Sequence, residues 1–432
     1  MKSRIIVRSL LAWLFVGILT PQFSHASPAN NFYVPPVPKD FSQTEFYLIT
    51  VGTGAEVYTA FGHTLVRFID RSNNTDVVYN WGVFDFNDPM FVPNFVYGKM
   101  NYRMDVFSMS DVLNIYRMEK RSVVHEKINL TTKQKKQFFD KIIWNSKSEN
   151  LYYRYQYFLD NCSTKVRDYL NEVLHNRVRE AFQKAPGTTD LRNSIRDHLA
   201  GYPFIHSGLE VLMNGSIDSR MSAWEEMYLP QYLNNYLSDM PAFDDNGQPI
   251  EGSKLLSERR VIYDFQSPVP PDYSGFQVLF WIFLVSMLFV WLSLGRGYLL
   301  KIGYRVLGLV SISWGLLAGF FGVAMILIWM VSMHEHGYHS ANIWLYWPTD
   351  LILIRSGISF LKGNSISYHA KWNNIVYWNS VLHLILTPVF LGLFLFGVIT
   401  QDVSKVLLYQ SSIAMMIYGV LVVKGIRRDS SL

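Results

Sequence analysis

The chain contains one cysteine, and its position is the first indication of chemistry. Cys162 follows Asp160 and Asn161, two residue types that commonly cap the N-terminus of a helix. Apolar residues then recur at helical spacing, at positions 166, 170, 173 and 174. We therefore expect Cys162 in the first turn of a helix, where unpaired amides and the helix dipole lower the pKa of a thiol. This setting is typical of a nucleophile.

A lone cysteine is often only a small buried hydrophobic residue. Here the neighbours Ser163, Thr164 and Lys165 are polar, and an idle exposed thiol is prone to oxidation outside the cytosol. A cysteine nucleophile also needs a base of near-neutral pKa within hydrogen-bond reach. His63 is the preferred candidate, because it follows a glycine at the start of a predicted strand. The competing histidines are His125, His175, His198 and His206.

The elements that must position these side chains form a mixed domain. Alternating, β-branched and aromatic residues predict strands at 46–51, 61–69, 77–84 and 122–130. Thr131 or Thr132 is expected to cap a helix that buries Phe138, Phe139, Ile142 and Ile143. Helical signals continue between residues 181 and 240. The sequence thus predicts an α+β domain over residues 27–241.

The N-terminus has the features of an export signal. Lys2, Arg4 and Arg8 precede a short apolar run, and Ser24-His25-Ala26 resembles a cleavage site. We predict a signal peptide at 1–26, which places the following domain outside the cytosol; an uncleaved anchor would do the same. A single cysteine leaves no internal disulfide to form.

The C-terminal half is apolar, whereas the region from about 30 to 270 has an ordinary globular composition. We predict a linker at 242–274 and a transmembrane helical domain at 275–428. The segment Ile343 to Leu361 contains Pro348, Asp350 and Arg355, so it either spans the membrane or re-enters it. We expect it to span, which makes five spans, because the basic residues that flank the spans then lie on the cytoplasmic side. Four clear apolar runs are near the roughly 20 residues that a span needs: 276–294, 306–331, 376–399 and 406–423.

Other polar residues in this half are candidates for a metal site or for a path along which a lipid headgroup passes. The outer end of the second predicted span carries His334, Glu335, His336 and His339. Their spacing matches no ligand motif, so we expect an interfacial polar cap and no metal site. Asp350 and His383 lie in apolar runs and either line a path for a lipid headgroup or pack helices together. The modest net charge of +5, without a basic and aromatic pattern, argues against nucleic acid.

Four motifs in order carry a resemblance to a known family. They are Phe61-Gly62-His63-Thr64, Tyr79 to Phe86, Phe95 to Lys99, and Asp160 to Thr164. The chain resembles the Lnb-type lipoprotein N-acyltransferase family, over about residues 40 to 240 and onward into the membrane half. The order of His before Cys also resembles circularly permuted NlpC/P60 enzymes. The resemblance implies a papain-like α+β domain fused to an all-α transmembrane bundle of about five helices.

The resemblance implies an enzyme of the bacterial inner membrane, multi-pass, with its catalytic domain on the periplasmic side. A membrane phospholipid would donate a fatty acyl chain to Cys162, and the N-terminal amine of a diacylglyceryl-cysteine lipoprotein would accept it. Cys162 is then the nucleophile, His63 its base, and Asn80 the residue that orients His63. Tyr79 and Asp85 are rivals for the orienting role. Asn161 or the amides at the helix start would stabilise the oxyanion, unless Asn161 is only the N-cap.

No cofactor is expected, since amide formation from a thioester is downhill. The aromatic residues Tyr152, Tyr153, Tyr155, Tyr157 and Phe158 either wall an acyl groove or belong to the ordinary core. Two alternatives stay open: a cysteine peptidase or amidase acting on cell-wall peptides, as in NlpC/P60 enzymes, and a non-enzymatic membrane scaffold with an idle thiol. The predicted spans argue against the peptidase, because a soluble wall substrate does not need them.

Overall fold

The computed structural model describes residues 33–85, 88–293, 299–362 and 370–422, so the predicted signal peptide lies outside the described residues. The chain divides into two compact units. The first unit comprises Met1–Gly54, Phe61–Ala185 and Ala223–Ser267, and the second comprises Ala55–Ala60, Pro186–Ser222 and Pro268–Leu432. Each unit is described separately below.

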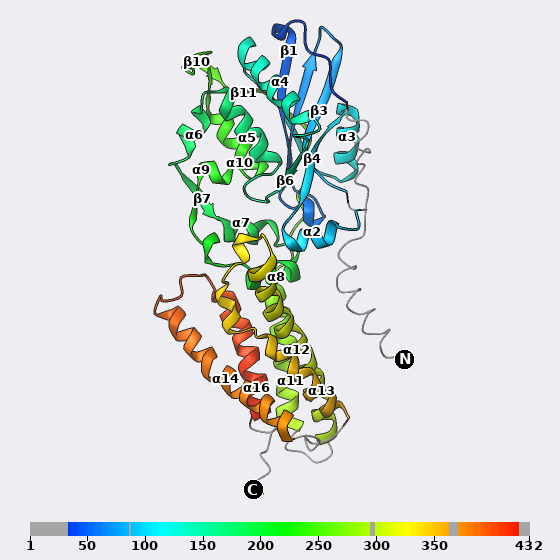
Figure 1. The fold of residues 1–432 in the computed structure, drawn as a ribbon, viewed down its shortest axis with the longest axis vertical. Coiled ribbons are helices and arrows are strands. Elements are labelled where there is room, and N and C mark those ends of the chain that lie inside the picture. The colour runs from blue at the N-terminus through cyan, green and yellow to red at the C-terminus, as the bar shows by residue number, and fades with distance from the viewer. Residues whose placement is uncertain (1–32, 86–87, 294–298, 363–369, 423–432) are drawn as a thin grey trace. The chain divides into compact units, whose positions relative to one another are not determined.

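A seven-stranded antiparallel sheet forms the centre of the first unit (Figure 1). Its order is β11-β5-β1-β2-β3-β4-β6. The four strands predicted from the sequence are present as β1, β2, β3 and β5. The bounds are β1 Thr44–Val51, β2 His63–Asp70, β3 Thr75–Val83, β4 Asn101–Phe107, β5 Val123–Ile128, β6 Tyr152–Arg154 and β11 Leu256–Tyr263.

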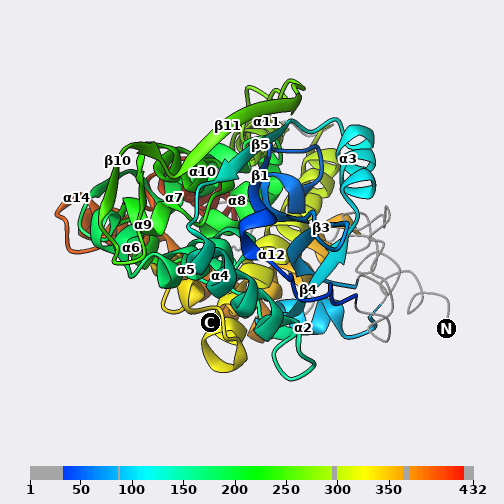
Figure 2. The ribbon, with the colours of Figure 1, turned by 90° about the horizontal axis from the view of Figure 1, so that it is seen from above.

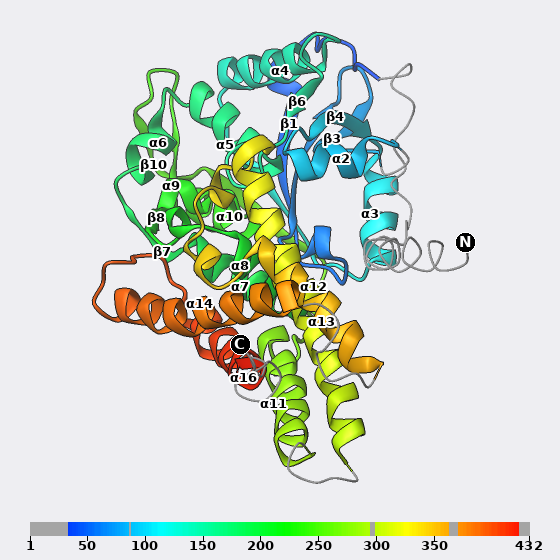
Figure 3. The ribbon, with the colours of Figure 1, turned by 60° about the horizontal axis from the view of Figure 1, so that its bottom comes forward.

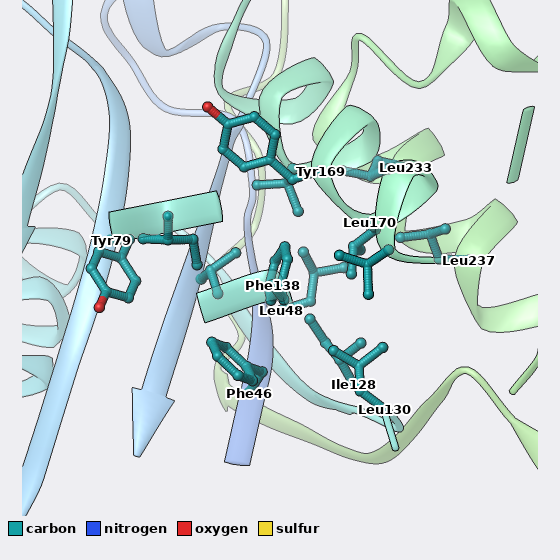
Figure 4. Packing of buried hydrophobic residues seen from close by; sticks show 14 of the residues in the cluster. Phe46, Leu48, Tyr79, Ile128, Leu130, Phe138, Tyr169, Leu170, Leu233 and Leu237 are labelled. Atoms are coloured by element: carbon teal, nitrogen blue, oxygen red, sulfur yellow. The ribbon is translucent and has the colours of Figure 1, made fainter. Parts of the chain in front are cut away.

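Both faces of this sheet are buried, because alternate residues of its central strands are apolar on each side. Phe46 and Leu48 of β1 face helices α4 (Thr132–Ser146), α5 (Cys162–Val173) and α10 (Pro230–Asp239) (Figure 4). Ile49 and Val51 face α3 (Met109–Met118) on the other side. Figures 1 and 2 both place α3 across the sheet from α5.

The predicted helix caps and apolar stripes are present. Thr131 is the N-cap of α4 and forms a capping box with Gln134. The stripe of α5 at 166, 170, 173 and 174 is buried in the core, as are Phe138 and Phe139 of α4. These helices form because their apolar stripes complete the core beneath the sheet. The remaining helices and strands of this unit are α2 Phe91–Tyr97, α6 Arg177–Phe182, α9 Ala223–Glu226, β9 Pro241–Phe243 and β10 Pro249–Lys254.

The prediction of a linker at 242–274 is wrong for its first part. Strands β9 and β10 pair with each other, and β11 pairs with β5 at the edge of the sheet. The buried Leu255 and Leu256 anchor this return into the core. Asp244, Asp245 and Gly247 lie in the turn between β9 and β10, where Asp244 N–H donates to the carbonyl of Gln248. The predicted domain at 27–241 also differs from the observed division, since Pro186–Ser222 belongs to the second unit.

Within the described residues of the second unit, three helices are long and apolar enough to cross a membrane: α11 Gly275–Ser293, α12 Leu300–Val331 and the part Asn374–Leu395 of α14 (Ala370–Leu395). The count of five spans is not confirmed. The fifth predicted run is helical but divided by a π turn, Leu407–Ser411, between α15 (Ser404–Val406) and α16 (Ser412–Val420). The smaller elements of this unit are β7 Pro186–Asp190, β8 Arg220–Ser222, α7 Leu191–His198 and α8 Pro203–Leu212.

The ambiguous segment 343–361 is not one long helix. It contains the end of one 3-10 turn (Ala341–Trp344), a second turn at Pro348–Leu351, and the ten-residue helix α13 (Ile352–Leu361). At about 1.5 Å per residue, α13 is roughly half the length that the hydrocarbon core requires. It lies against α12 (Figure 3), where Gly308 and Gly315 allow close approach: a Cβ on Gly315 would lie 2.8 Å from the carbonyl oxygen of Asp350.

Candidate functional site

Asn161 fixes the start of the helix that carries the cysteine. Its Oδ1 accepts hydrogen bonds from the N–H groups of Ser163 and Thr164, both at 2.9 Å. Thr164 Oγ1 in turn accepts from Asn161 N–H at 2.7 Å, which completes a capping box. Cys162 is therefore the first residue of α5, as the sequence predicts.

The amide of Asn161 is committed elsewhere. Its Nδ2 donates to the carbonyl oxygens of Tyr157 and Tyr228, both at 2.9 Å, so both of its hydrogens are used. The side chain of Asn161 thus caps the helix and links the segments that contain Tyr157 and Tyr228. It has no donor left for an oxyanion. By contrast, the N–H of Cys162 has no hydrogen-bond acceptor within the described part of the chain.

His63 is the first residue of β2, opposite Val51 of β1. The preceding Gly62 has φ +77°, and a Cβ there would lie 2.7 Å from the carbonyl oxygen of Val51, so the turn requires glycine. One residue further, Thr64 Oγ1 and Ser163 Oγ share a hydrogen bond of 2.8 Å in a fully buried position. Because residues 64 and 163 are joined, their neighbours His63 and Cys162 are brought together. The ring of His63 and the thiol of Cys162 lie close enough for each to shift the pKa of the other.

Asn80 of β3 holds the other side of the ring. Its Oδ1 lies 2.6 Å from His63 Nε2. Since a carbonyl oxygen only accepts, Nε2 carries a proton and donates it to Asn80, which leaves Nδ1 for Cys162. Asn80 can reach the ring because it pairs with Leu65 in the register of β2 and β3. Tyr79, one of its rivals, is buried in the core cluster that includes Cys162, and its hydroxyl has no hydrogen-bond partner among the described residues.

The competing histidines lie elsewhere. His125 stacks on Tyr47, and burial together with the charges of Arg67 and Arg260 lowers its pKa to about 4. The others bind local partners: His175 Nε2 lies 3.2 Å from Asp245 O, His198 Nδ1 lies 2.8 Å from Ser194 O, and His206 Nε2 lies 3.3 Å from Glu210 Oε1. Among the described residues, His63 is the one of these five whose charge affects the pKa of Cys162.

The pKa values of the pair move in opposite directions. Burial raises the pKa of the Cys162 thiol, but the charge of His63, its hydrogen bond, and further bonds from Thr64 N–H and Ser163 outweigh burial and bring the pKa below its ordinary value. Burial lowers the pKa of His63, but the Cys162 thiolate and the bonds to Cys162 and Asn80 raise it overall. These shifts favour a thiolate beside an imidazolium.

Cys162 is 6% exposed, and its surroundings are polar as well as aromatic. The buried side chains of Tyr153, Tyr155 and Tyr157 lie close enough to feel its charge, which adds to the effect of burial in raising their pKa values. Tyr152, the first of the predicted aromatic residues, is exposed instead. Strand β6 and the loop after it therefore contribute one aromatic wall of the site.

Sequence reasoning missed Arg121. This residue is buried, its Nε donates to the carbonyl of Gly52 at 2.9 Å, and Nη1 pairs with Glu119 at 3.0 Å. Its positive charge opposes protonation of His63. No local pattern marks Arg121, because it reaches the site only through the pairing of β1 with β5.

Asp350 and His383 form a polar hub within the second unit. Asp350 Oδ1 accepts hydrogen bonds from Asn379 Nδ2 at 2.9 Å, His383 Nε2 at 3.0 Å and Tyr418 O–H at 2.8 Å. All four groups are buried, and their bonds connect α14 and α16 to the turn before α13, which matches the packing alternative.

In the predicted polar cap, His336 Nδ1 lies 2.9 Å from Ser216 Oγ and His339 packs on Trp329. The described residues contain no group of three or more potential metal-ligating His, Cys, Asp or Glu side chains.

Residues 39–196 match the family model described as the Lnb N-terminal periplasmic domain. This segment is similar to the Lnb periplasmic domain family. The match covers less than half of the chain but includes His63, Asn80 and Cys162. No curated protein and no solved structure matches the chain, and the resemblance to NlpC/P60 enzymes is not confirmed. Together with the three apolar helices among the described residues, this match fits a membrane protein with a periplasmic domain.

Proposed function

We propose that the protein is a cysteine-dependent apolipoprotein N-acyltransferase of the bacterial inner membrane. It would move a fatty acyl chain from a phospholipid, through a thioester on Cys162, to the N-terminal amine of diacylglyceryl-cysteine lipoproteins. The observation that carries the proposal is the grouping of Cys162, at the first turn of a capped helix, with His63, whose ring is hydrogen-bonded to Asn80. The Lnb periplasmic domain and the apolar helices support a substrate that belongs to the membrane.

In the first half-reaction the Cys162 thiolate attacks the carbonyl carbon of a phospholipid ester. A bond forms between sulfur and carbon, and negative charge develops on the carbonyl oxygen. The N–H of Cys162, at the positive end of α5, is placed to stabilise this oxyanion. The His63 imidazolium then gives its Nδ1 proton to the departing glyceryl oxygen as the ester bond breaks. The products are a lysophospholipid and a thioester on Cys162.

In the second half-reaction the lipoprotein amine attacks the thioester. The reference pKa of an α-amine is about 8, so a usable fraction is neutral at physiological pH. His63, now neutral, accepts the proton that the amine loses as the carbon–nitrogen bond forms. Sulfur leaves as the thiolate, which the imidazolium stabilises again. Asn80 keeps the imidazole in the tautomer that both steps need.

The peptidase and scaffold alternatives differ from acyl transfer in the role that they give to the Cys162 thiol. A peptidase would use the same thiol but cut wall peptides. A scaffold would have no use for the two opposed pKa shifts of Cys162 and His63. The membrane helices favour acyl transfer over the cleavage of a soluble wall peptide.

The test is mass spectrometry of lipoproteins from cells that depend on this protein. Wild type should restore the N-linked acyl chain, whereas Cys162→Ala and His63→Ala should not. His125→Ala is the matched control, a buried histidine of the same sheet outside the site, and it should behave as wild type. Trapped Cys162 should carry a thioester-bound fatty acid. Normal lipoproteins together with altered wall fragments would overturn the proposal in favour of a peptidase.

A further inference from the structure

Helix α2 of the first unit has an unusual surface. None of its seven residues is buried, yet five of them are Phe, Val or Tyr. Phe95 is 51% exposed, Val96 56%, and Met90, which precedes the helix, 54%. The stretch from Met90 to Tyr97 carries no charge, and the exposed Lys99 follows directly. An apolar patch rimmed by a cation is typical of a segment that rests in a membrane interface.

Chain connectivity keeps a bilayer within reach of this patch. The last strand of the first unit ends at Tyr263, and the apolar helix α11 begins at Gly275. The eleven residues between them span at most about 40 Å when fully extended. A folded unit on such a tether stays close to the membrane surface, so an apolar helix on it can meet lipid.

A row of aromatic contacts joins α2 to the nucleophile. Phe91 of α2 stacks on Phe84 at 5.4 Å, and Phe84 stacks on Tyr102 at 4.8 Å. Tyr102 packs against Tyr155 at 4.5 Å, and Tyr155 lies within the field of the Cys162 thiolate. The contacts lie within the first unit, and α2 caps one end of its sheet (Figure 1). An acyl chain lying along this row would bring its ester toward the sulfur.

We propose that α2, together with Met90, inserts into the outer leaflet of the bilayer and delivers the phospholipid acyl chain to the aromatic row. The occupant of the patch is phospholipid; Lys99 lies at the level of the phosphates. The delivery of the acyl chain rests on the proposed function, whereas the insertion of α2 does not.

Fluorescence in nanodiscs tests the insertion. The full chain with Cys162→Ala has no cysteine, so Phe95→Cys or Val96→Cys introduces a single labelling site. A polarity-sensitive dye there should be quenched by phospholipids spin-labelled on the upper acyl chain and protected from aqueous iodide. Met118→Cys, on an equally apolar but distant residue that is 76% exposed, is the matched control and should show the reverse. A dye at 95 and 96 that behaves like the dye at 118 would overturn the inference and leave the patch for a protein partner.

A second measurement tests delivery. Val96→Asp should slow thioester formation from phospholipid vesicles on the order of tenfold, since aspartate is among the residues a bilayer excludes most strongly. Alkylation of Cys162 by water-soluble iodoacetamide should stay unchanged, which shows that the variant is folded and its thiol intact. Val92→Asp repeats the test at another turn. An equal loss in the rates of thioester formation and of Cys162 alkylation would overturn the proposed delivery of the acyl chain. If wild type forms no thioester at all, the proposed function fails, and the quenching data still decide the insertion.

Discussion

Removing Asn80 tests the reasoning about the site most directly. In Asn80→Ala the 2.6 Å contact with His63 Nε2 is lost, while the sheet pairing of β3 is kept. Hydrogen bonds to charged groups contribute about 1.5–3 kcal/mol, so acyl transfer should fall on the order of ten- to hundredfold. The pKa of His63 should fall, because Asn80 favours the charged ring. The pKa of the Cys162 thiol should rise, because the imidazolium that stabilises the thiolate is weakened.

The assay is the rate of Cys162 alkylation as a function of pH, which follows the thiolate. In wild type the rise in rate should occur below the pH at which an ordinary thiol ionises. In Asn80→Ala it should move to higher pH, and in His63→Ala further still, because the largest effects that oppose burial of the thiol are then lost. Asn129→Ala, which removes a hydrogen bond to the carbonyl of Lys254 at the far edge of the sheet, should leave the profile in place. A profile that is the same in wild type and Asn80→Ala would refute the assigned role of Asn80.

Three further predictions concern stability, each measured by thermal unfolding of the purified protein in detergent. Asn161→Ala should lower the free energy of unfolding by about 2 kcal/mol or more, since it removes a helix cap and leaves two carbonyls without donors. Gly62→Ala should destabilise by about 1–3 kcal/mol and reduce thiol alkylation, because φ is positive and a Cβ would strike the backbone of Val51. Asp350→Ala should lower the melting temperature of the second unit and leave Cys162 alkylation unchanged, since three buried donors lose their acceptor. An unchanged melting temperature in any of the three would contradict the contact on which that prediction depends.

The sequence predicted those parts of the fold that a short window reveals. Strands β1, β2 and β3 alternate apolar residues, and Asn161 stands where a cap must stand, so both were found. Strand β11 was missed because an edge strand needs few buried residues, and its centre at 258–260 is charged and exposed. The segment before α13 was ambiguous because Asp350 finds three of its hydrogen-bond donors on helices distant in sequence, which no short window reveals.

Some residues of the site can likewise be identified from a short stretch of sequence, and others cannot. Cys162 and Asn161 lie in one motif, and their local chemistry is visible in the sequence. The role of His63 required a partner about a hundred residues away, and the sequence alone left five histidines to choose from. The register of β2 and β3, which places Asn80 beside the ring, follows from strand pairing and not from any local pattern. Arg121 could not be identified from the sequence for the same reason, because the pairing of β1 with β5 brings it to the site.

The position of β11 has a consequence for biogenesis. The Lnb match ends at residue 196, yet the sheet that holds His63 receives its outermost strand from 256–263, only eleven residues before the first apolar helix. During export the strand at β5 therefore keeps a bare edge until nearly the whole extracytoplasmic chain has emerged, and such edges promote misassociation. Completion of the sheet and entry of α11 into the translocation machinery must then occur almost together. A fragment ending at 241 would lack this last strand, and we expect it to aggregate where a fragment ending at 267 stays soluble.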